Sequence, residues 1–222
     1  GWYTVGGGRE VLNEFYKKYN CISLLAGNTG CQMGGWFRKE INTIEDLKGL
    51  KIRTIQNPVF IDIFNTLGAN AIPMPFTEVF NALESKAIDG QETPYSNIYG
   101  NKFFEVTKYI SNTGHIYGGA VVLVSKKFWD TLNIGERKLM QDSCNTARDF
   151  ERQFNRSEDP KLLDMIKAKG GIYTEISSAE RSRMREMLKP VYDKYSANLG
   201  EDIVKQTLTE LAKYRATHKS GQ

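Results

Sequence analysis

The sequence is poor in the residues that bind transition metals. It contains only two His and three Cys, and Cys21, Cys31 and Cys144 lie far apart with no CxxC spacing. A Cys/His zinc site is therefore excluded, because such sites need several closely spaced ligands. We expect three small buried thiols, the usual environment of a free cysteine. A bridge between Cys21 and Cys31 stays open at this stage.

Long apolar runs and blocks of like charge are also missing. The longest apolar run, 120–124, is far shorter than the roughly 20 residues of a membrane-spanning helix. No charged segment followed by an apolar stretch marks a signal peptide at the start. The net charge of +4 is spread over short alternations of sign, so there is no basic stripe for nucleic acid. We expect a soluble chain that neither binds nucleic acid nor inserts into a membrane.

What is present is the composition of a globular protein, with 40% hydrophobic and 25% charged residues. A chain of this length forms one large domain or two smaller lobes. Its first residue is Gly1, inside the strand-like stretch 2–5, and not Met. We expect that sequence upstream of Gly1 is missing.

A short apolar run followed by an amphipathic helix is the dominant rhythm of the first half. Strands are expected at 21–25, 50–54, 70–74 and 88–90. Helices are expected at about 9–19, 43–49, 58–68 and 77–83, with Thr43 as an N-cap, Pro58 as a first helical residue and Gly68 as a C-cap. This alternation predicts an α/β fold with parallel strands.

The second half is mostly helical. Two β-rich runs within 109–124 are separated by Gly118 and Gly119, as expected where a chain crosses between lobes. From Gly135 onward an apolar stripe predicts a long helix, which Pro160 is expected to kink or restart. The stripe consists of Met140, Cys144, Ala147, Phe150 and Phe154. A strand at 172–176 and helices at 178–197 and 201–216 complete the prediction.

Arg53 is well placed to bind a ligand, because it lies at the end of a predicted strand, and α/β folds bind ligands at the carboxyl ends of parallel strands. A guanidinium can hold both oxygens of a carboxylate, each charge-assisted bond contributing about 1.5 to 3 kcal/mol. The alternative is a surface arginine in an ion pair. Upstream, the glycine-rich segment 26–38 could bring its backbone close to a small polar ligand or form a tight turn around a buried Trp36.

The segment 89–95 follows another short strand and carries acidic, amide and hydroxyl groups. It could form a second wall of the same cleft, or a simple Asp-Gly turn. A glycosidase pair of Asp89 and Glu92 is disfavoured, since nothing nearby would raise the pKa of one carboxyl and not the other. Ser, Cys and His are too scattered for a catalytic triad, and we interpret His115 as a structural imidazole. We expect no catalysed reaction.

Taken together, several segments resemble a known family, the extracytoplasmic solute-binding proteins of tripartite ATP-independent periplasmic (TRAP) transporters, which carry carboxylate-bearing solutes. Residues 44–53 resemble the DLKGLKxR segment of that family, and residues 67–69 with 73–83 resemble its LGA and P-M-x-F-x-E-V-Y-x-A-L segments. Residues 88–92, 102–109 and 113–115 are similar to its IDGQE, KFYEVxKY and TxH run. Residues 27–38 are similar to the GNTGxQMGGWFRK segment of the branch that binds 2-oxo acids.

The resemblance implies a two-lobed α/β clamshell of the periplasmic-binding-protein type (type II-like), hinged by crossing strands and spanned by a long helix. It places residues 1–30 in part of lobe 1, 31–117 in lobe 2, and 118–158 in lobe 1 and the spanning helix. Residues 159–222 are then C-terminal helices packed across lobe 2 and the hinge.

The same resemblance implies the residues that bind the solute. Arg53 matches the carboxylate-binding arginine and Phe76 an apolar wall. Glu92 and Thr93 occupy the polar position after the IDGQ turn, and Gln32 and Trp36 match the other side of the oxo-acid pocket. The oxo-acid branch also binds sodium, but Thr93 and Ile116 or Tyr117 depart from its pattern, so no cofactor is expected and sodium stays open.

The implied function is that of a periplasmic receptor that captures a small organic acid, such as a 2-oxo acid or a dicarboxylate. The receptor would deliver the acid to TRAP membrane subunits. Two alternatives stay open. One is a ligand-sensing module of the same fold, and the other is an α/β enzyme acting on an oxo acid.

Overall fold

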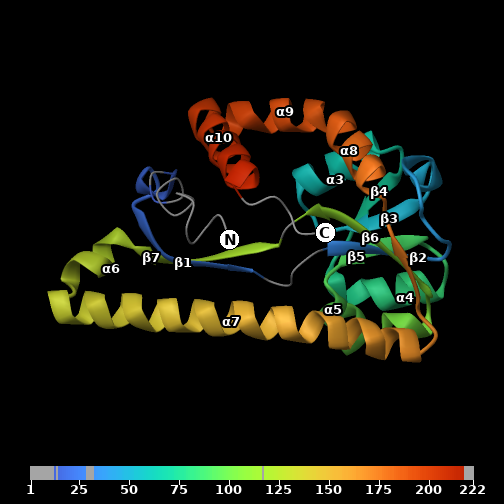
Figure 1. Ribbon diagram of the computed structural model, residues 1–222, viewed down its shortest axis with the longest axis horizontal. Helices are drawn as coiled ribbons and strands as arrows, with labels where there is room; N and C mark the ends of the chain where they lie inside the picture. Colours follow the sequence, from blue (N-terminus) through green and yellow to red (C-terminus); the bar gives the residue numbers. More distant parts are fainter. Residues whose placement is uncertain (1–12, 14, 29–32, 117, 218–222) are drawn as a thin grey trace. The chain divides into compact units, whose positions relative to one another are not determined.

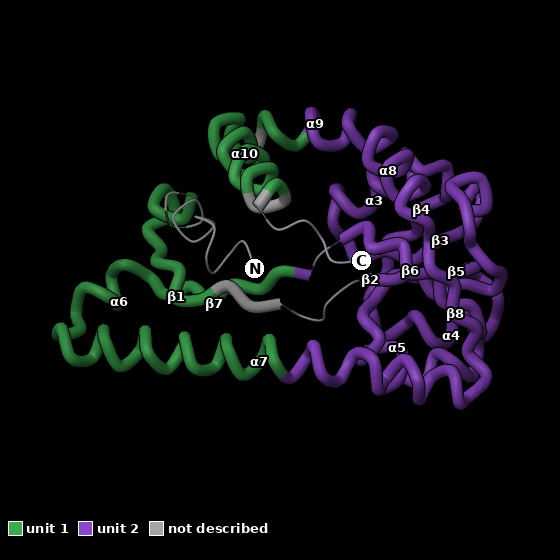
Figure 2. Tube along the Cα trace, in the orientation of Figure 1, with its two compact units in different colours: residues 1–28, 119–153, 195–222 green, residues 29–118, 154–194 purple. Residues whose placement is uncertain are grey.

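The computed structural model describes residues 13, 15–28, 33–116 and 118–217 of the chain. It divides the chain into two compact units, which Figure 2 shows in green and purple. Unit 1 comprises residues 1–28, 119–153 and 195–222, and unit 2 comprises residues 29–118 and 154–194. The chain therefore passes between units after residues 28, 118, 153 and 194. The predicted passages were after residues 30, 117 and 158, and the predicted packing of the lobes stays a prediction.

Unit 2 contains a six-stranded mixed sheet in the order β4-β3-β5-β2-β6-β8, visible in Figure 1. The strands are β2 (Met33–Phe37), β3 (Lys51–Thr54), β4 (Asn70–Pro73), β5 (Gly90–Thr93), β6 (Tyr109–Ile116) and β8 (Ile172–Glu175). Strand β3 pairs in parallel with β4 and with β5, as the βα rhythm predicts. Strand β2 was not predicted, and it pairs antiparallel with both β5 and β6.

Helices cover both faces of this sheet, as Figure 1 shows. On one side lie α3 (Pro58–Thr66) and α8 (Ser178–Met187), and on the other lie α4 (Val79–Glu84) and α5 (Tyr95–Gly100). The core on the α4 side is built around Trp36, which packs with Val79, Leu83, Ile98 and Ile166. Short 3-10 turns η1 (Ile44–Leu47), η2 (Phe76–Glu78) and η3 (Phe103–Glu105) complete the layers.

The helix starts and stops follow from local sequence. Helix α3 begins with Pro58 after Asn57, whose side chain accepts a hydrogen bond from the Val59 N–H. Gly68, just beyond its end, has φ of +90°, a conformation that favours glycine. Thr43 caps η1 through a capping box with Asp46, so the N-cap was predicted correctly, although a single 3-10 turn follows it and not a helix to residue 49.

Unit 1 contains the antiparallel pair β1 (Cys21–Asn28) and β7 (Gly119–Ser125). The register shifts at Leu24, and the Leu24 carbonyl accepts a hydrogen bond of 2.7 Å from the Gln141 side chain. Helix α6 (Lys126–Thr131) follows β7, and α10 (Glu201–Thr217) also belongs to this unit. Residue 13 and residues 15–17 are helical, and the rest of the helix predicted at 9–19 includes residues outside the described ranges.

Helices α7 (Ile134–Ala168) and α9 (Lys189–Leu199), in the described part of the chain, each pass from one unit to the other. Helix α7 runs for 35 residues and continues through Pro160, so the prediction that Pro160 restarts the helix was wrong. Phe150 and Phe154 of the predicted stripe are 68% and 51% exposed, so the stripe is not a buried face over its whole length. The predicted helix 178–197 is in fact α8 followed by α9.

The cysteines are less buried than expected. Cys21 and Cys144 are free thiols of intermediate burial, and Cys31 lies outside the described residues. Within the described ranges, none of the helices combines the length and apolar character that crossing a membrane requires.

Candidate functional site

Polar residues end two neighbouring parallel strands of unit 2. Strand β3 ends with Arg53 and Thr54, and β5 ends with Gln91, Glu92 and Thr93. Arg53 and Gln91 are register partners, so the carboxyl ends of both strands lie at the same edge of the sheet. All five side chains belong to residues that are buried. Buried polar residues at such an edge are unusual, and this is where open α/β sheets bind ligands.

Arg53 and Thr93 project from the same face of the sheet. Arg53 pairs with Gln91, and Thr93 lies two residues beyond Gln91, so strand alternation directs all three side chains to one side. Gln91 also pairs with Trp36 across the β5–β2 ladder, which places Trp36 on this face. This face is therefore the one covered by α4 and α5.

The Arg53 guanidinium is held from one side. Its Nε and Nη2 atoms donate to the Met74 carbonyl at 3.1 and 3.0 Å. Its carbon Cζ lies 5.6 Å from the centre of the Phe76 ring. Arg53 is only 3% exposed, yet it forms no ion pair with any residue of the described ranges. A carbonyl and an aromatic ring therefore fix the orientation of this cation without neutralising its charge.

Phe76 and Trp36 supply apolar surface beside the arginine. The Phe76 ring lies edge-on to Phe103, with ring centres 5.7 Å apart. Trp36 is fully buried, and its indole N–H donates to the Phe103 carbonyl at 3.2 Å. Because that bond uses the only polar group of the indole, Trp36 acts here as part of the hydrophobic core.

Glu92 projects from the opposite face of β5. It pairs with Gly35 in the register, two residues from the pair of Phe37 and Gly90, so all four residues face the same side of the sheet. A Cβ at Gly35 would lie 2.0 Å from the Phe37 ring, and a Cβ at Gly90 would lie 2.3 Å from it. Glycine at both positions therefore lets the Phe37 ring lie against the backbone on the face from which Glu92 projects.

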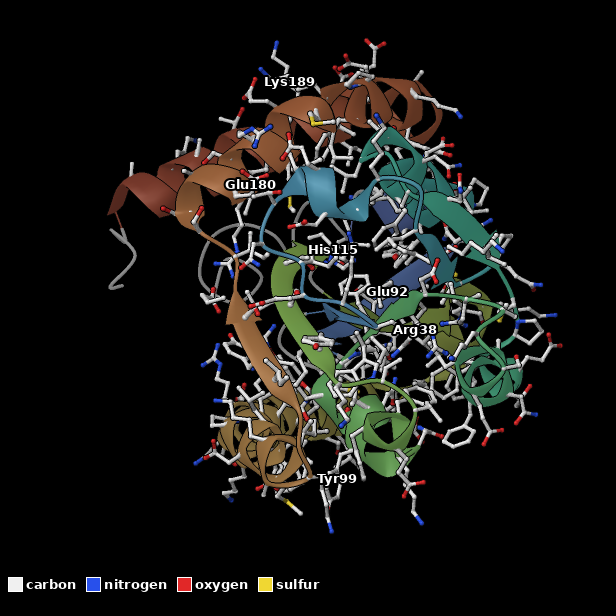
Figure 3. All side chains as sticks on the ribbon, turned by 90° about the vertical axis from the view of Figure 1, so that its right-hand side faces the viewer. Arg38, Glu92, Tyr99, His115, Glu180 and Lys189 are labelled. Carbon is white, nitrogen blue, oxygen red and sulfur yellow. The ribbon has the colours of Figure 1, made fainter. Side chains whose placement is uncertain are left out.

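His115 lies next to this carboxyl. Its Nε2 atom is 3.9 Å from Glu92 Oε2, and its Nδ1 atom is 2.6 Å from the Thr113 hydroxyl. The Phe64 ring of α3 lies edge-on to the imidazole, with ring centres 5.1 Å apart. Figure 3 shows the labelled Glu92 and His115 side chains close together.

Burial controls the charge of these groups. Loss of hydration raises the pKa of Glu92 to about 8, although the nearby positive charge of Arg53 opposes the shift. Loss of hydration also lowers the pKa of His115 to about 4. Burial lowers the pKa of Arg53 and Glu92 opposes that shift, but arginine remains protonated in proteins. At neutral pH the cluster therefore carries a single positive charge, on Arg53.

The structure brings together most of the residues that the sequence predicted for the site. Arg53, Trp36, Phe76 and Thr93 lie on one face, whereas Glu92 projects to the other, and Gln32 lies outside the described residues. Their roles in binding stay predictions. Sequence reasoning missed Gln91, whose buried side-chain amide has no hydrogen-bond partner in the described part of the chain. The signal that could have identified Gln91 is strand alternation, because Gln91 and Thr93 are two residues apart in β5 and therefore face the same side of the sheet.

Comparison with known proteins gives consistent matches. The family model for bacterial extracellular solute-binding protein, family 7 (DctP) matches residues 2–198. The sialic acid-binding periplasmic protein SiaP of Vibrio cholerae is 29% identical over 197 residues, which are 89% of this chain and 60% of that protein. The chain therefore spans about 60% of the length of this curated relative.

Solved structures match over nearly the whole chain. A TRAP periplasmic solute-binding protein from Ochrobactrum anthropi is 40% identical with a TM-score of 0.87, over 93% of this chain and 64% of that one. The sugar acid binding protein DctPAm of Advenella mimigardefordensis, in complex with galactonate, is 35% identical with a TM-score of 0.80, over 92% and 66% of the two chains. These matches confirm the predicted family resemblance and the periplasmic-binding-protein fold class.

Proposed function

The chain belongs to bacterial extracellular solute-binding protein family 7, and on this ground we propose that it is the receptor of a TRAP transporter that captures a small organic acid. This family consists of solute-binding proteins and not of enzymes. The alternative of an α/β enzyme acting on an oxo acid is therefore not supported.

The observation that carries the proposal is the uncompensated charge of Arg53. Its guanidinium is nearly inaccessible to water and forms no ion pair within the described ranges, while burial keeps Glu92 mostly protonated at neutral pH. A buried, unpaired cation is costly, and an anionic partner that makes bidentate hydrogen bonds offsets this cost. We therefore propose that Arg53 binds the carboxylate of the solute, with Thr93 as a second contact and Phe76 as an apolar wall.

The relatives support an acid as the solute class. One is described as binding sialic acid, and the structure of another contains galactonate. Both compounds carry a carboxylate on a polyhydroxylated chain, so the shared chemistry is the carboxylate, and the remainder of the solute differs. We propose a carboxylate-bearing solute for this chain, with the 2-oxo acids, dicarboxylates and sugar acids as the candidates to test.

We propose that binding requires no cation. A protonated Glu92 is neutral and a poor cation ligand, and the positive charge of Arg53 lies nearby. In the ranges that the structure describes, no three His, Cys, Asp or Glu side chains are grouped so that they could hold a metal ion. The same affinity in sodium and in choline buffers would support this part of the proposal, and a loss of affinity in choline would contradict it.

The relatives are periplasmic proteins, and we propose the same compartment for this chain, with delivery of the solute to TRAP membrane subunits. The proposed function is tested by thermal unfolding of the protein against pyruvate, succinate, galactonate and sialic acid. A bound acid stabilises the protein by about 2.7 kcal/mol at 100 times its dissociation constant. A shift with none of the acids, or turnover of a bound acid followed by NMR, would contradict the proposal.

A further inference from the structure

The Thr93 hydroxyl is in contact with a side chain that neither the family resemblance nor the sequence pattern points to. Asn97, in the first turn of α5, donates from its Nδ2 atom to Thr93 Oγ1 at 2.8 Å. Both backbone polar groups of Asn97 are hydrogen-bonded. Its N–H donates to the Pro94 carbonyl, and its carbonyl accepts from the Asn101 side chain. The amide therefore approaches Thr93 from a rigid position.

This hydrogen bond determines which further hydrogen bonds the Thr93 hydroxyl can form. A threonine hydroxyl has one proton to donate and two lone pairs to accept with. Asn97 occupies a lone pair, so the proton is available for an acceptor elsewhere. Thr93 is 4% exposed, and within the described ranges its hydroxyl makes no hydrogen bond as a donor. A buried donor without an acceptor is unfavourable, so the hydroxyl favours a ligand atom that accepts.

The available proton lies on the same face of the sheet as the Arg53 guanidinium, through the shared register with Gln91. A cationic fork and a hydroxyl proton are both donors. The guanidinium can only donate, and the hydroxyl directs its single proton to an acceptor, so together they match an anionic oxygen. A ligand group that must donate finds no acceptor in the guanidinium and is disfavoured there.

We propose that Asn97 is a positioning residue that fixes the Thr93 hydroxyl as a donor to the solute and so contributes to the preference for carboxylates. The inference rests on the proposed function, because it assumes that Thr93 contacts the bound acid. Asn97 itself does not contact the solute in this account.

The substitution Asn97→Asp tests the direction of the bond. The introduced carboxylate would accept the proton of Thr93, so the hydroxyl could no longer donate to the solute. We expect isothermal titration with the tightest-binding of pyruvate, succinate, galactonate and sialic acid to show a loss of affinity on the order of 10- to 100-fold. Asn81→Asp is the matched control, because Asn81 is exposed on α4, which covers the same face of the sheet. We expect it to change affinity by less than about 3-fold.

A double-mutant cycle separates positioning from a purely structural role. In the Thr93→Val background the hydroxyl is missing, so Asn97→Ala should cost no further affinity, whereas in the unaltered background it should cost several-fold. An equal cost in both backgrounds would overturn the inference, because Asn97 would then act independently of Thr93.

The outcomes also separate this inference from the proposed function. Unchanged affinity of Asn97→Asp, while Thr93→Val loses affinity, would overturn the inference alone. Unchanged affinity of Thr93→Val would overturn it as well and remove Thr93 from the site. Failure of the unaltered protein to bind any of the four acids would overturn both. Unfolding of each variant by heat, followed by circular dichroism, shows whether it retains the fold.

Discussion

Glu92 Oε2 lies 3.9 Å from His115 Nε2, and both side chains are almost completely buried. Such a pair would form a salt bridge if both groups were charged. Burial instead raises the pKa of the carboxyl and lowers the pKa of the imidazole, so that near neutral pH both are mostly uncharged. The pair therefore does not neutralise Arg53, and the arginine keeps its charge for a solute.

This relationship predicts how stability depends on pH. Between its ordinary pKa of 4.5 and its folded pKa of about 8, Glu92 binds more protons when folded than when unfolded. Its contribution to stability is therefore lost as pH rises through about 8. His115 has the opposite sign and acts between about 4 and 6.5, so the two effects partly cancel below pH 6.5.

We predict that the free energy of unfolding falls by roughly 1 to 2 kcal/mol between pH 6.5 and 8, and that Glu92→Gln removes most of this fall. Urea unfolding at several pH values measures it. The same slope in the variant would show that Glu92 is ionised throughout this range and would contradict the charge assignment.

Glu180 joins α8 to the 3-10 turn η1. Its Oε1 accepts from the Ile44 N–H at 2.7 Å, and Arg183 lies 2.8 Å from its other oxygen. Because Glu180 is buried, Glu180→Ala leaves the Ile44 N–H without its acceptor and should cost about 2 to 4 kcal/mol of stability.

The matched control is Glu186→Ala on the same helix. The side chain of Glu186 is 68% exposed and pairs only with the exposed Lys189 among the described residues, so its loss should change stability by less than about 0.5 kcal/mol. Figure 3 labels Glu180 on α8 and Lys189 at the start of α9. Equal effects of the two variants in denaturant unfolding would refute the structural role of Glu180.

Gly90 is predicted to be required for packing against β2. A Cβ there would lie 2.8 Å from the Trp36 carbonyl and 2.3 Å from the Phe37 ring. Gly90→Ala should therefore destabilise unit 2 by about 2 to 3 kcal/mol. Gly100→Ala is the control, because nothing in the described ranges lies within 4 Å of its Cβ position, and it should be neutral or stabilising by up to about 1 kcal/mol. A neutral Gly90→Ala in thermal unfolding would contradict the packing.

The sequence predicts strands β3 and β4 well, because the helix between them has a clear apolar rhythm and recognisable start and stop signals. Asn57 with Pro58 starts α3 and Gly68 follows its end, and these signals are local. Strand β2 was missed for a physical reason. Gly34 and Gly35 indicate a turn when considered alone, and the Phe37 ring that requires Gly35 becomes apparent only in the folded structure.

The site was predicted in part. The α/β pattern predicts that Arg53 lies at the end of a strand. It does not predict that Arg53 is buried without an ion pair in the described ranges. The sequence pattern predicts a strand that ends at residue 90, whereas β5 runs from Gly90 to Thr93, so the pattern does not reveal the alternation that separates Glu92 from Thr93. The role of Asn97 depends on the direction of one hydrogen bond, which sequence spacing cannot supply.

The central claim is that Arg53 binds the carboxylate of the solute, and isothermal titration of Arg53→Ala with the acid found by thermal screening tests it most directly. Arg185→Ala serves as the control, because Arg185 is exposed and bonds only to Ser182 within the described ranges. We predict that Arg53→Ala weakens binding at least about 100-fold while Arg185→Ala leaves it unchanged. Equal affinity of Arg53→Ala and the unaltered protein would contradict the account.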